Sequence, residues 1–232
     1  MKVALGWLLS LSFFLAGPAL SAQDDKKDDK KDEKKDDKKD DKKDDKKEKD
    51  PSKVVESEYY PLKEGLTWRY KSTGKSFTIT VTKIEKVDGE DTARLETRIA
   101  AEDKGKDSLI ASETVVVRKD GVYRTAVAGS KATPPMPFFK LPPEKEVKWV
   151  YEGTIAGEKV KIDFVAGEQK GLKAGGKTYD TVTVTGSGLK VDGQNVGFTY
   201  YFAPKVGLVK QVFDIGGSKF ELELDKFEEP KK

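Results

Sequence analysis

The feature that most restricts how this chain can fold is a tract of 27 charged residues, 24–50, that contains no apolar side chain. A segment with nothing to bury cannot offset the conformational entropy lost on ordering. A helix is also disfavoured, because the period of four places like charges at i and i+4 and Asp is a poor residue for a helix interior. We therefore expect a disordered spacer over 23–54.

The charge balance of this tract limits what it can bind. Its 14 acidic and 13 basic residues nearly cancel, so no single-sign field is present to attract a charged polymer. Two interpretations stay open: a tether that holds the rest of the chain off a surface, or a solubilising tail without a partner.

A hydrophobic leader precedes the tract. Lys2 is followed by a mostly apolar stretch, 3–16, a Gly-Pro break at 17–18 and small residues up to Ala22. This pattern predicts a secretory signal peptide over 1–22, cleaved after Ser21 or Ala22. The apolar run is shorter than the roughly 20 residues of a membrane span, and no later segment is long enough. We expect export, with a periplasmic or extracellular location and no membrane span after cleavage.

The chain contains no Cys and no His, which excludes several kinds of chemistry. A disulfide framework, Ser-His-Asp or Cys-His catalysis and the usual zinc and iron sites are ruled out. Neither of the common glycine-rich phosphate loops is present. We expect no cofactor and no metal. Residues 51–232 carry 30 Lys and Arg against 27 Asp and Glu, too mild an excess to indicate a nucleic-acid partner.

The remaining residues follow the alternation of β-strands, with every second residue apolar. The clearest alternating segments are 66–70, 77–81, 160–164, 181–185 and 220–224. Residue pairs suited to tight hairpin turns lie at 88–89, 120–121, 192–193 and 216–217. We predict an all-β domain over 55–229, a monomer, with about ten to eleven antiparallel strands in a curved sheet or half-open barrel.

Two stretches of this domain resemble each other. Trp68-Arg69-Tyr70 and Trp149-Val150-Tyr151 are each followed by a turn and an alternating strand. This predicts two pseudo-repeats, about 58–130 and 140–228, within one sheet or barrel, because halves of about 85 residues would have thin cores. The halves join through Thr133–Pro143, whose prolines predict that it forms no central strand.

Three segments carry a resemblance to known proteins: YPLKEGLTW at 60–68, AGGKTYDTVTV at 174–184 and YYFAPKVGLVK at 200–210. They resemble secreted, planctomycete-type bacterial β-rich proteins of unknown function, whose fold is similar to the curved sheets of Lol-type periplasmic lipoprotein carriers. The resemblance covers most of 58–228 and brings no catalytic residues. Lys205 stands where glycine is usual, so we expect no strict need for a tight turn there.

Aromatic side chains are the remaining candidates for a site. They have two interpretations: the core of a β-protein, or the lining of an apolar groove for a lipid, peptide or glycan. The Phe pair at 138–139 could form a partner-docking loop or tuck under the sheet. The candidate ligand-binding residues are Trp68, Tyr70, Trp149, Tyr151, Phe138, Phe139, Tyr200 and Phe202, with Met136 beside them.

Three functional hypotheses follow. The first is a non-enzymatic exported domain that binds a lipid, another apolar ligand or an envelope component; it predicts a pocket of several hundred Å³ containing Trp68 or Trp149. The second is a structural or surface-display protein without a ligand site. The third is a hydrolase with two inward carboxylates about 5–9.5 Å apart.

Overall fold

The computed structural model describes residues 54–55, 57–101, 105–191 and 193–230. The leader and the charged tract 24–50 lie outside these residues, so the signal peptide and the spacer remain predictions. Every regular element of the described chain is a β-strand, as the alternation predicts, and all strand pairs are antiparallel.

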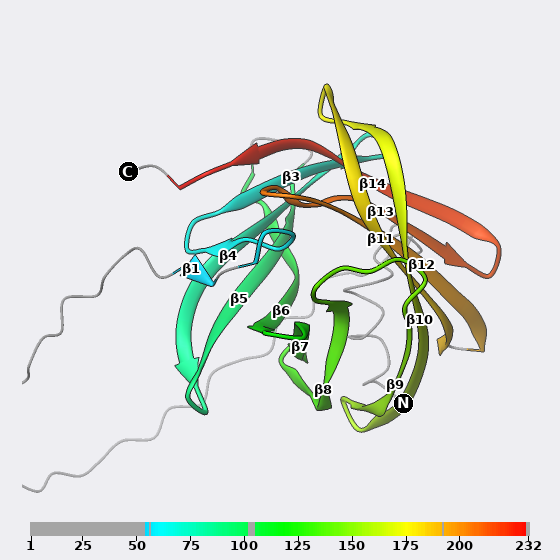
Figure 1. Cartoon of the computed structure of the whole chain (residues 1–232). Helices are drawn as coiled ribbons and strands as arrows, with labels where there is room; N and C mark the ends of the chain where they lie inside the picture. The colour runs from blue at the N-terminus through cyan, green and yellow to red at the C-terminus, as the bar shows by residue number, and fades with distance from the viewer. Residues whose placement is uncertain (1–53, 56, 102–104, 192, 231–232) are drawn as a thin grey trace, which may run out of the picture.

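The strands form one closed barrel of twelve. The antiparallel all-β prediction is confirmed, but the expected curved sheet or half-open barrel of about ten to eleven strands is not what forms. Successive strands from β3 to β14 are neighbours around the wall, and β14 then pairs with β3, with Glu223 opposite Lys71. In Figure 1 the red strand β14 accordingly lies beside the cyan strand β3. The sequence could not show closure, because local alternation says nothing about pairing between the first and last strands.

Twelve strands make up the wall, six from each half of the chain. The first half gives β3 (Thr67–Ser72), β4 (Lys75–Val87), β5 (Glu90–Ile99), β6 (Ser108–Arg118), β7 (Gly121–Val127) and β8 (Ser130–Lys140). The second half gives β9 (Lys148–Ile155), β10 (Glu158–Ala174), β11 (Lys177–Val191), β12 (Gln194–Ala203), β13 (Gly207–Ile215) and β14 (Ser218–Glu228). A further pair, β1 (Val54–Val55) and β2 (Leu62–Lys63), lies outside the wall.

The predicted pseudo-repeats each supply strands to this barrel, but the two halves are not equivalent. Trp68 on β3 is almost fully buried, whereas Trp149 on β9 is half-buried. The strand β8 at 130–140 also lies across the predicted end of the first repeat at residue 130. The two halves therefore do not match as the Trp-x-Tyr segments predict, and duplication remains a prediction.

The prediction that the proline-rich connector Thr133–Pro143 forms no central strand also needs correction. Its first part belongs to β8, which pairs with β7 through two register shifts. On the other side the ladder with β9 is limited to Ala132 opposite Ile155 and Thr133 opposite Thr154. Proline has no N–H to donate, so the ladder ends where the prolines begin. The prolines permit a strand here but not a regular ladder with both neighbours.

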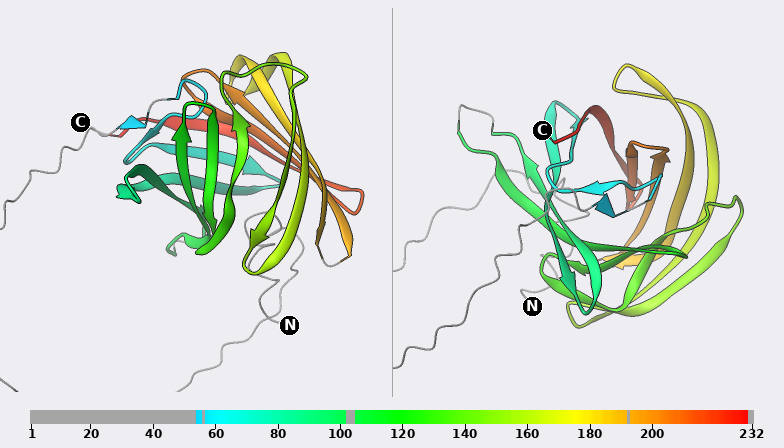
Figure 2. Two further views of the ribbon diagram at one scale, coloured as in Figure 1. Left: turned by 60° about the horizontal axis from the view of Figure 1, so that its bottom comes forward. Right: turned by 60° about the vertical axis from the view of Figure 1, so that its left-hand side comes forward.

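The two ends of the barrel are built differently. The segment 57–66 lies at the end where β3 begins, and we call this the capped end. The right-hand view of Figure 2 shows the cyan pair of β1 and β2, the second of which belongs to this segment, lying across the ring of barrel strands. The tip of the β10–β11 hairpin closes over the same end: a Cβ on Gly175 would lie 2.9 Å from the carbonyl oxygen of Asp225 on β14. The hairpin turns at 73–74, 128–129, 156–157 and 216–217 lie at the opposite end.

The turn between β12 and β13 corrects the expectation about Lys205. Lys205 has φ of 64°, the left-handed region that normally favours glycine. The tight turn is therefore present without a glycine at this position. Its backbone N–H donates to the carbonyl oxygen of Glu58 at 2.6 Å, so this turn also holds the capping segment.

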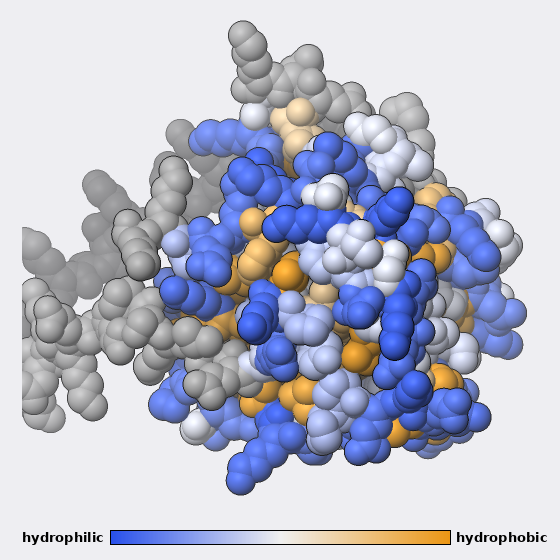
Figure 3. Space-filling model, turned by 45° about the horizontal axis from the view of Figure 1, so that its top comes forward, coloured by the Kyte–Doolittle hydropathy of each residue, from blue (hydrophilic) through white to orange (hydrophobic). Residues whose placement is uncertain are grey.

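The outer surface carries mainly polar side chains. Figure 3 shows one face, on which hydrophilic residues predominate and hydrophobic ones appear between them. The described residues include no helix that is both long and apolar enough to cross a membrane.

Candidate functional site

A cavity of about 100 Å³ lies inside the barrel. Its lining includes Trp68 and Tyr70 from β3 and Tyr200 from β12. Val127 and Ile155, which directly precede turns at the opposite end, also line it. The cavity therefore extends from the aromatic cap toward the opposite end of the barrel. A twelve-stranded barrel is wider than the eight-stranded kind whose side chains fill the interior, which explains why space remains.

This cavity is smaller than the pocket of several hundred Å³ expected from the sequence. An apolar cavity of about 150 Å³ is known to hold benzene, so the space suits a group of only a few non-hydrogen atoms. It contains Trp68 but not Trp149. The interior is thus largely filled by side chains and retains room for a small group.

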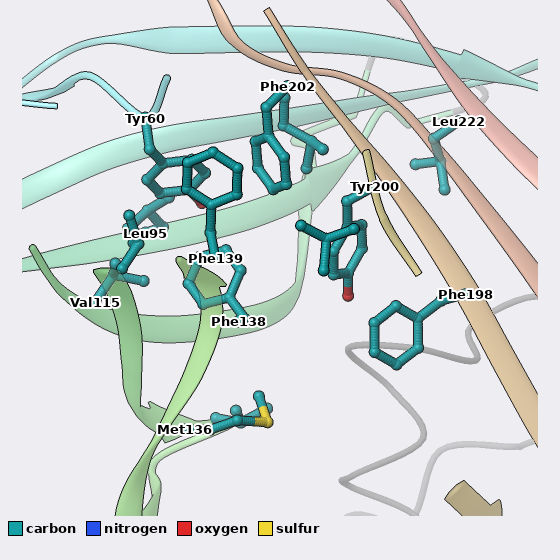
Figure 4. Packing of buried hydrophobic residues seen from close by; sticks show 14 of the residues in the cluster. Tyr60, Leu95, Val115, Met136, Phe138, Phe139, Phe198, Tyr200, Phe202 and Leu222 are labelled. Carbon is teal, nitrogen blue, oxygen red and sulfur yellow. The ribbon is translucent and has the colours of Figure 1, made fainter. Parts of the chain in front are cut away.

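Aromatic rings close the capped end of the cavity. Tyr60 from the capping segment stacks on Trp68 at 6.4 Å between ring centroids and meets Phe138 and Phe202 edge-on. Phe139 packs on Phe202 at 4.6 Å. Figure 4 shows Tyr60, Phe138, Phe139 and Phe202 gathered on one side of the interior, with Tyr200 and Phe198 beyond them.

The Phe pair of the proline-rich segment belongs to this cluster. Phe138 and Phe139 are each only 1% exposed. Of the two interpretations of the pair, packing beneath the sheet is confirmed and an exposed docking loop is wrong. Burial of large apolar rings of this kind stabilises the folded chain.

Hydrogen bonds hold the two rings of β3 in place. The indole Nε1–H of Trp68 donates to the carbonyl oxygen of Val206 at 2.6 Å. The hydroxyl of Tyr70 donates to the carbonyl oxygen of Leu208 at 2.7 Å. Burial, and next to it the Glu113 carboxylate, raises the pKa of Tyr70 well above its ordinary value. These two side chains therefore form a fixed, uncharged wall.

A charged pair lies among the apolar lining. Nε–H of Arg124 on β7 donates to Oε2 of Glu113 on β6 at 2.5 Å, and both side chains are largely buried. The guanidinium carbon lies 4.3 Å from the ring centre of Phe138 and 5.4 Å from that of Tyr200. Nη1–H also donates to the Tyr200 hydroxyl at 3.4 Å. Burial opposes the charged form of Arg124, but Glu113, Tyr200 and Tyr60 outweigh it and raise its pKa.

Trp149 and Tyr151 lie apart from the cavity, at the seam between β8 and β9. The Trp149 Nε1–H donates to the carbonyl oxygen of Pro137 at 2.7 Å, and the Tyr151 hydroxyl donates to that of Pro134 at 3.0 Å. These side chains satisfy proline carbonyl oxygens for which the short β8–β9 ladder provides no backbone N–H. Because their hydrogen bonds join β9 to β8, Trp149 and Tyr151 are best explained as residues that hold the barrel wall together.

The structure thus divides the eight predicted residues into three groups. Trp68, Tyr70 and Tyr200 line the cavity, together with Met136. Phe138, Phe139 and Phe202 form the aromatic cap, while Trp149 and Tyr151 close the seam. Whether any of them contacts a ligand remains a prediction.

Sequence reasoning missed the polar residues of the cavity and several rings. Phe198 could have been found, because it continues the period of two through Tyr200 and Phe202. Gln211 could also have been found, because it occupies an alternate, inward position between Val209 and Phe213. Glu113 and Arg124 gave no signal, because register shifts in both of their strands hide the direction of their side chains.

The chemistry available in this cavity is limited. Glu113 is the one carboxylate among its described lining residues, and it is engaged by Arg124. A hydrolase of the two-carboxylate kind therefore finds no support in this cavity. No group of three or more Asp and Glu suited to a metal ion occurs within the described residues.

Comparisons with known proteins give two distant structural similarities. The chain is similar to a candidate lipoprotein from Parabacteroides distasonis, with a TM-score of 0.44 and 10% identity over 73% of this chain and 98% of that one. It is also similar to a candidate exported protein with a YmcC-like fold from Bacteroides fragilis, with a TM-score of 0.39 and 10% identity over 74% and 99% of the two chains. The sequence matches no family model and no curated protein.

Proposed function

We propose that this protein is an exported, non-enzymatic barrel that binds a small, mostly apolar ligand in its interior. The observation that carries the proposal is the cavity of about 100 Å³, lined by fixed rings such as Trp68 and Tyr70. Concave sites with apolar walls and a few placed polar groups are the usual form of a ligand pocket. The small volume limits the ligand to a small molecule or to the end of a longer one, such as a lipid chain.

Export rests on the leader at 1–22, with a periplasmic or extracellular destination. N-terminal sequencing of the protein recovered from cell fractions tests it. We expect mature chains that begin at Ala22 or Gln23, and full-length chains in the cytoplasm would contradict export.

Ligand binding can be tested with benzene as a probe of the cavity. Protein and benzene are mixed, and the fluorescence of Trp68 and the unfolding temperature are followed as the probe concentration rises. A ligand that binds only the native state raises stability with its concentration. We expect saturable binding and a rising unfolding temperature.

A cavity-filling variant is the matched control. Ala111 lines the cavity, so Ala111→Leu places extra carbon atoms in it. Such overpacking costs about 1–3 kcal/mol, which the fold should tolerate. We expect the folded variant to lose benzene binding. A wild-type protein that binds no probe would overturn the proposal and favour a purely structural or surface-display role.

A further inference from the structure

Gln211 on β13 is the one buried glutamine that faces the cavity within the described chain. Its side chain is 8% exposed, and none of the hydrogen bonds among the described residues reaches its amide group. No protein group among the described residues pairs with this amide, so its remaining hydrogen bonds can go only to water or to a ligand in the cavity. Gln211 is therefore a polar group directed into the cavity with donors and an acceptor to spare.

The neighbours of Gln211 extend this polar region. Tyr200 lies directly opposite Gln211 on the paired strand β12. The Tyr200 hydroxyl accepts from Nη1–H of Arg124, whose Nε–H is engaged by Glu113. Strands from opposite walls of the barrel thus bring an amide, a phenol and a paired guanidinium to the lining of the same cavity.

The charge in this region is balanced. Glu113 and Arg124 contribute one negative and one positive charge, in contact with each other. A buried anion would be repelled by Glu113, and a buried cation by Arg124, each without an unpaired counter-charge to compensate for lost water. An uncharged polar group meets neither penalty and can exchange hydrogen bonds with the Gln211 amide.

Building on the proposed ligand binding, we infer that Gln211 recognises an uncharged polar group, a hydroxyl, ester or carboxamide, on the small apolar ligand. The amide of Gln211 both donates and accepts, so it suits these groups and discriminates against ionised heads. Sites that hydrogen-bond a polar group in this way reject analogues that leave the buried partner unpaired.

Four small probes of similar size test the inference: butanamide, butanoate, butylammonium and benzene. Binding to the full-length protein after signal cleavage is followed at neutral pH by nuclear magnetic resonance, including the side-chain amide signal of Gln211. We expect butanamide to shift that signal and to bind more tightly than the two ions. In Gln211→Leu, butanamide should bind roughly fivefold more weakly, the loss of about one neutral hydrogen bond, while benzene binding is kept.

The exposed Gln169 on β10 provides the matched control. Gln169→Leu should leave all four affinities unchanged. If benzene binds but Gln211→Leu keeps its butanamide affinity, or an ion binds most tightly, this inference is wrong and the proposed function stands. If neither benzene nor butanamide binds, the proposed function and this inference both fall.

Discussion

At the residue scale, the Glu113–Arg124 pair places two charges inside an otherwise apolar barrel. Glu113 and Arg124 side chains are 19% and 12% exposed, so water compensates them only in part. Cation–π contacts to Phe138 and Tyr200 and the hydrogen bond to Tyr200 add to the pair. Removal of one partner leaves the other charge buried and unpaired, which is costlier than removal of both.

Glu113→Gln is therefore expected to destabilise the barrel by about 3 kcal/mol. Chemical denaturation of the variant and the wild type measures this difference. The double variant Glu113→Gln with Arg124→Met should lose less than the single variant. A single variant as stable as the wild type would show that water screens the pair.

Burial of tyrosines predicts the behaviour at high pH. Burial, followed by the Glu113 carboxylate, raises the pKa of Tyr60 and of Tyr70 well above the ordinary value of 10.0. Burial and the hydrogen bond to Asp120 raise the pKa of Tyr123 to about 12. Below pH 10 these phenols are protonated in both folded and unfolded chains, so they do not change stability. Above it the unfolded chain releases protons that the folded chain keeps, and unfolding becomes easier.

We expect the free energy of unfolding to fall as the pH rises above about 10, with ionisation of these phenols coupled to unfolding. The ultraviolet absorbance of tyrosinate, followed together with circular dichroism, tests this. If these tyrosines ionised near pH 10 in the intact barrel, they would be more exposed to water than the structure shows.

At the element scale, the weak joint of the barrel is the seam between β8 and β9. Side-chain donors on Trp149 and Tyr151 replace the ladder that the prolines interrupt. Gly153 permits this arrangement, since a Cβ there would lie 2.4 Å from the Tyr151 hydroxyl and 2.7 Å from the Thr133 carbonyl oxygen. The seam is therefore closed by a close approach that depends on glycine.

Gly153→Ala should displace the Tyr151 ring and break its hydrogen bond to Pro134. We expect a loss of about 1–3 kcal/mol, from overpacking together with the lost bond. Hydrogen exchange should increase at the few backbone bonds that join β8 to β9. Gly157→Ala, in the turn that follows β9, is the comparison. A Cβ there would meet nothing within 4 Å, so this variant tests the effect of the positive φ without the clash. Unchanged exchange at the seam in Gly153→Ala would contradict this account.

At the scale of the whole molecule, the capping segment ties the N-terminal part of the described chain to the barrel. The described contacts of the capped end include the pairing of Val55 with Leu62 and the contacts of Glu58 and Tyr59, all after the charged tract. Tyr60 and Leu62 are buried against the barrel interior. Removal of 24–50 therefore takes away none of the contacts described in the barrel.

Deletion of 24–50 should leave the unfolding temperature unchanged, because no described contact is lost. If the tract is a tether, the same deletion should change retention of the protein in the envelope fraction. A Gly-Ser spacer of equal length in place of 24–50 is the control for length alone. Unchanged retention would favour the solubilising-tail interpretation, and a lower unfolding temperature would show contacts between the tract and the barrel.

The sequence by itself determined that the domain is built from antiparallel strands and, in the clearest strands, which residues share one face. Period-two alternation and turn residues are local properties, so β3, β4, β10, β11 and β14 could be predicted from short windows. Only the tertiary structure decided that β14 closes onto β3, that the proline-rich β8 joins the wall, and that Trp149 closes a seam while Trp68 lines a cavity. Glu113, Arg124 and Gln211 line the same cavity because distant strands and register shifts place them there, and no local pattern records such an arrangement.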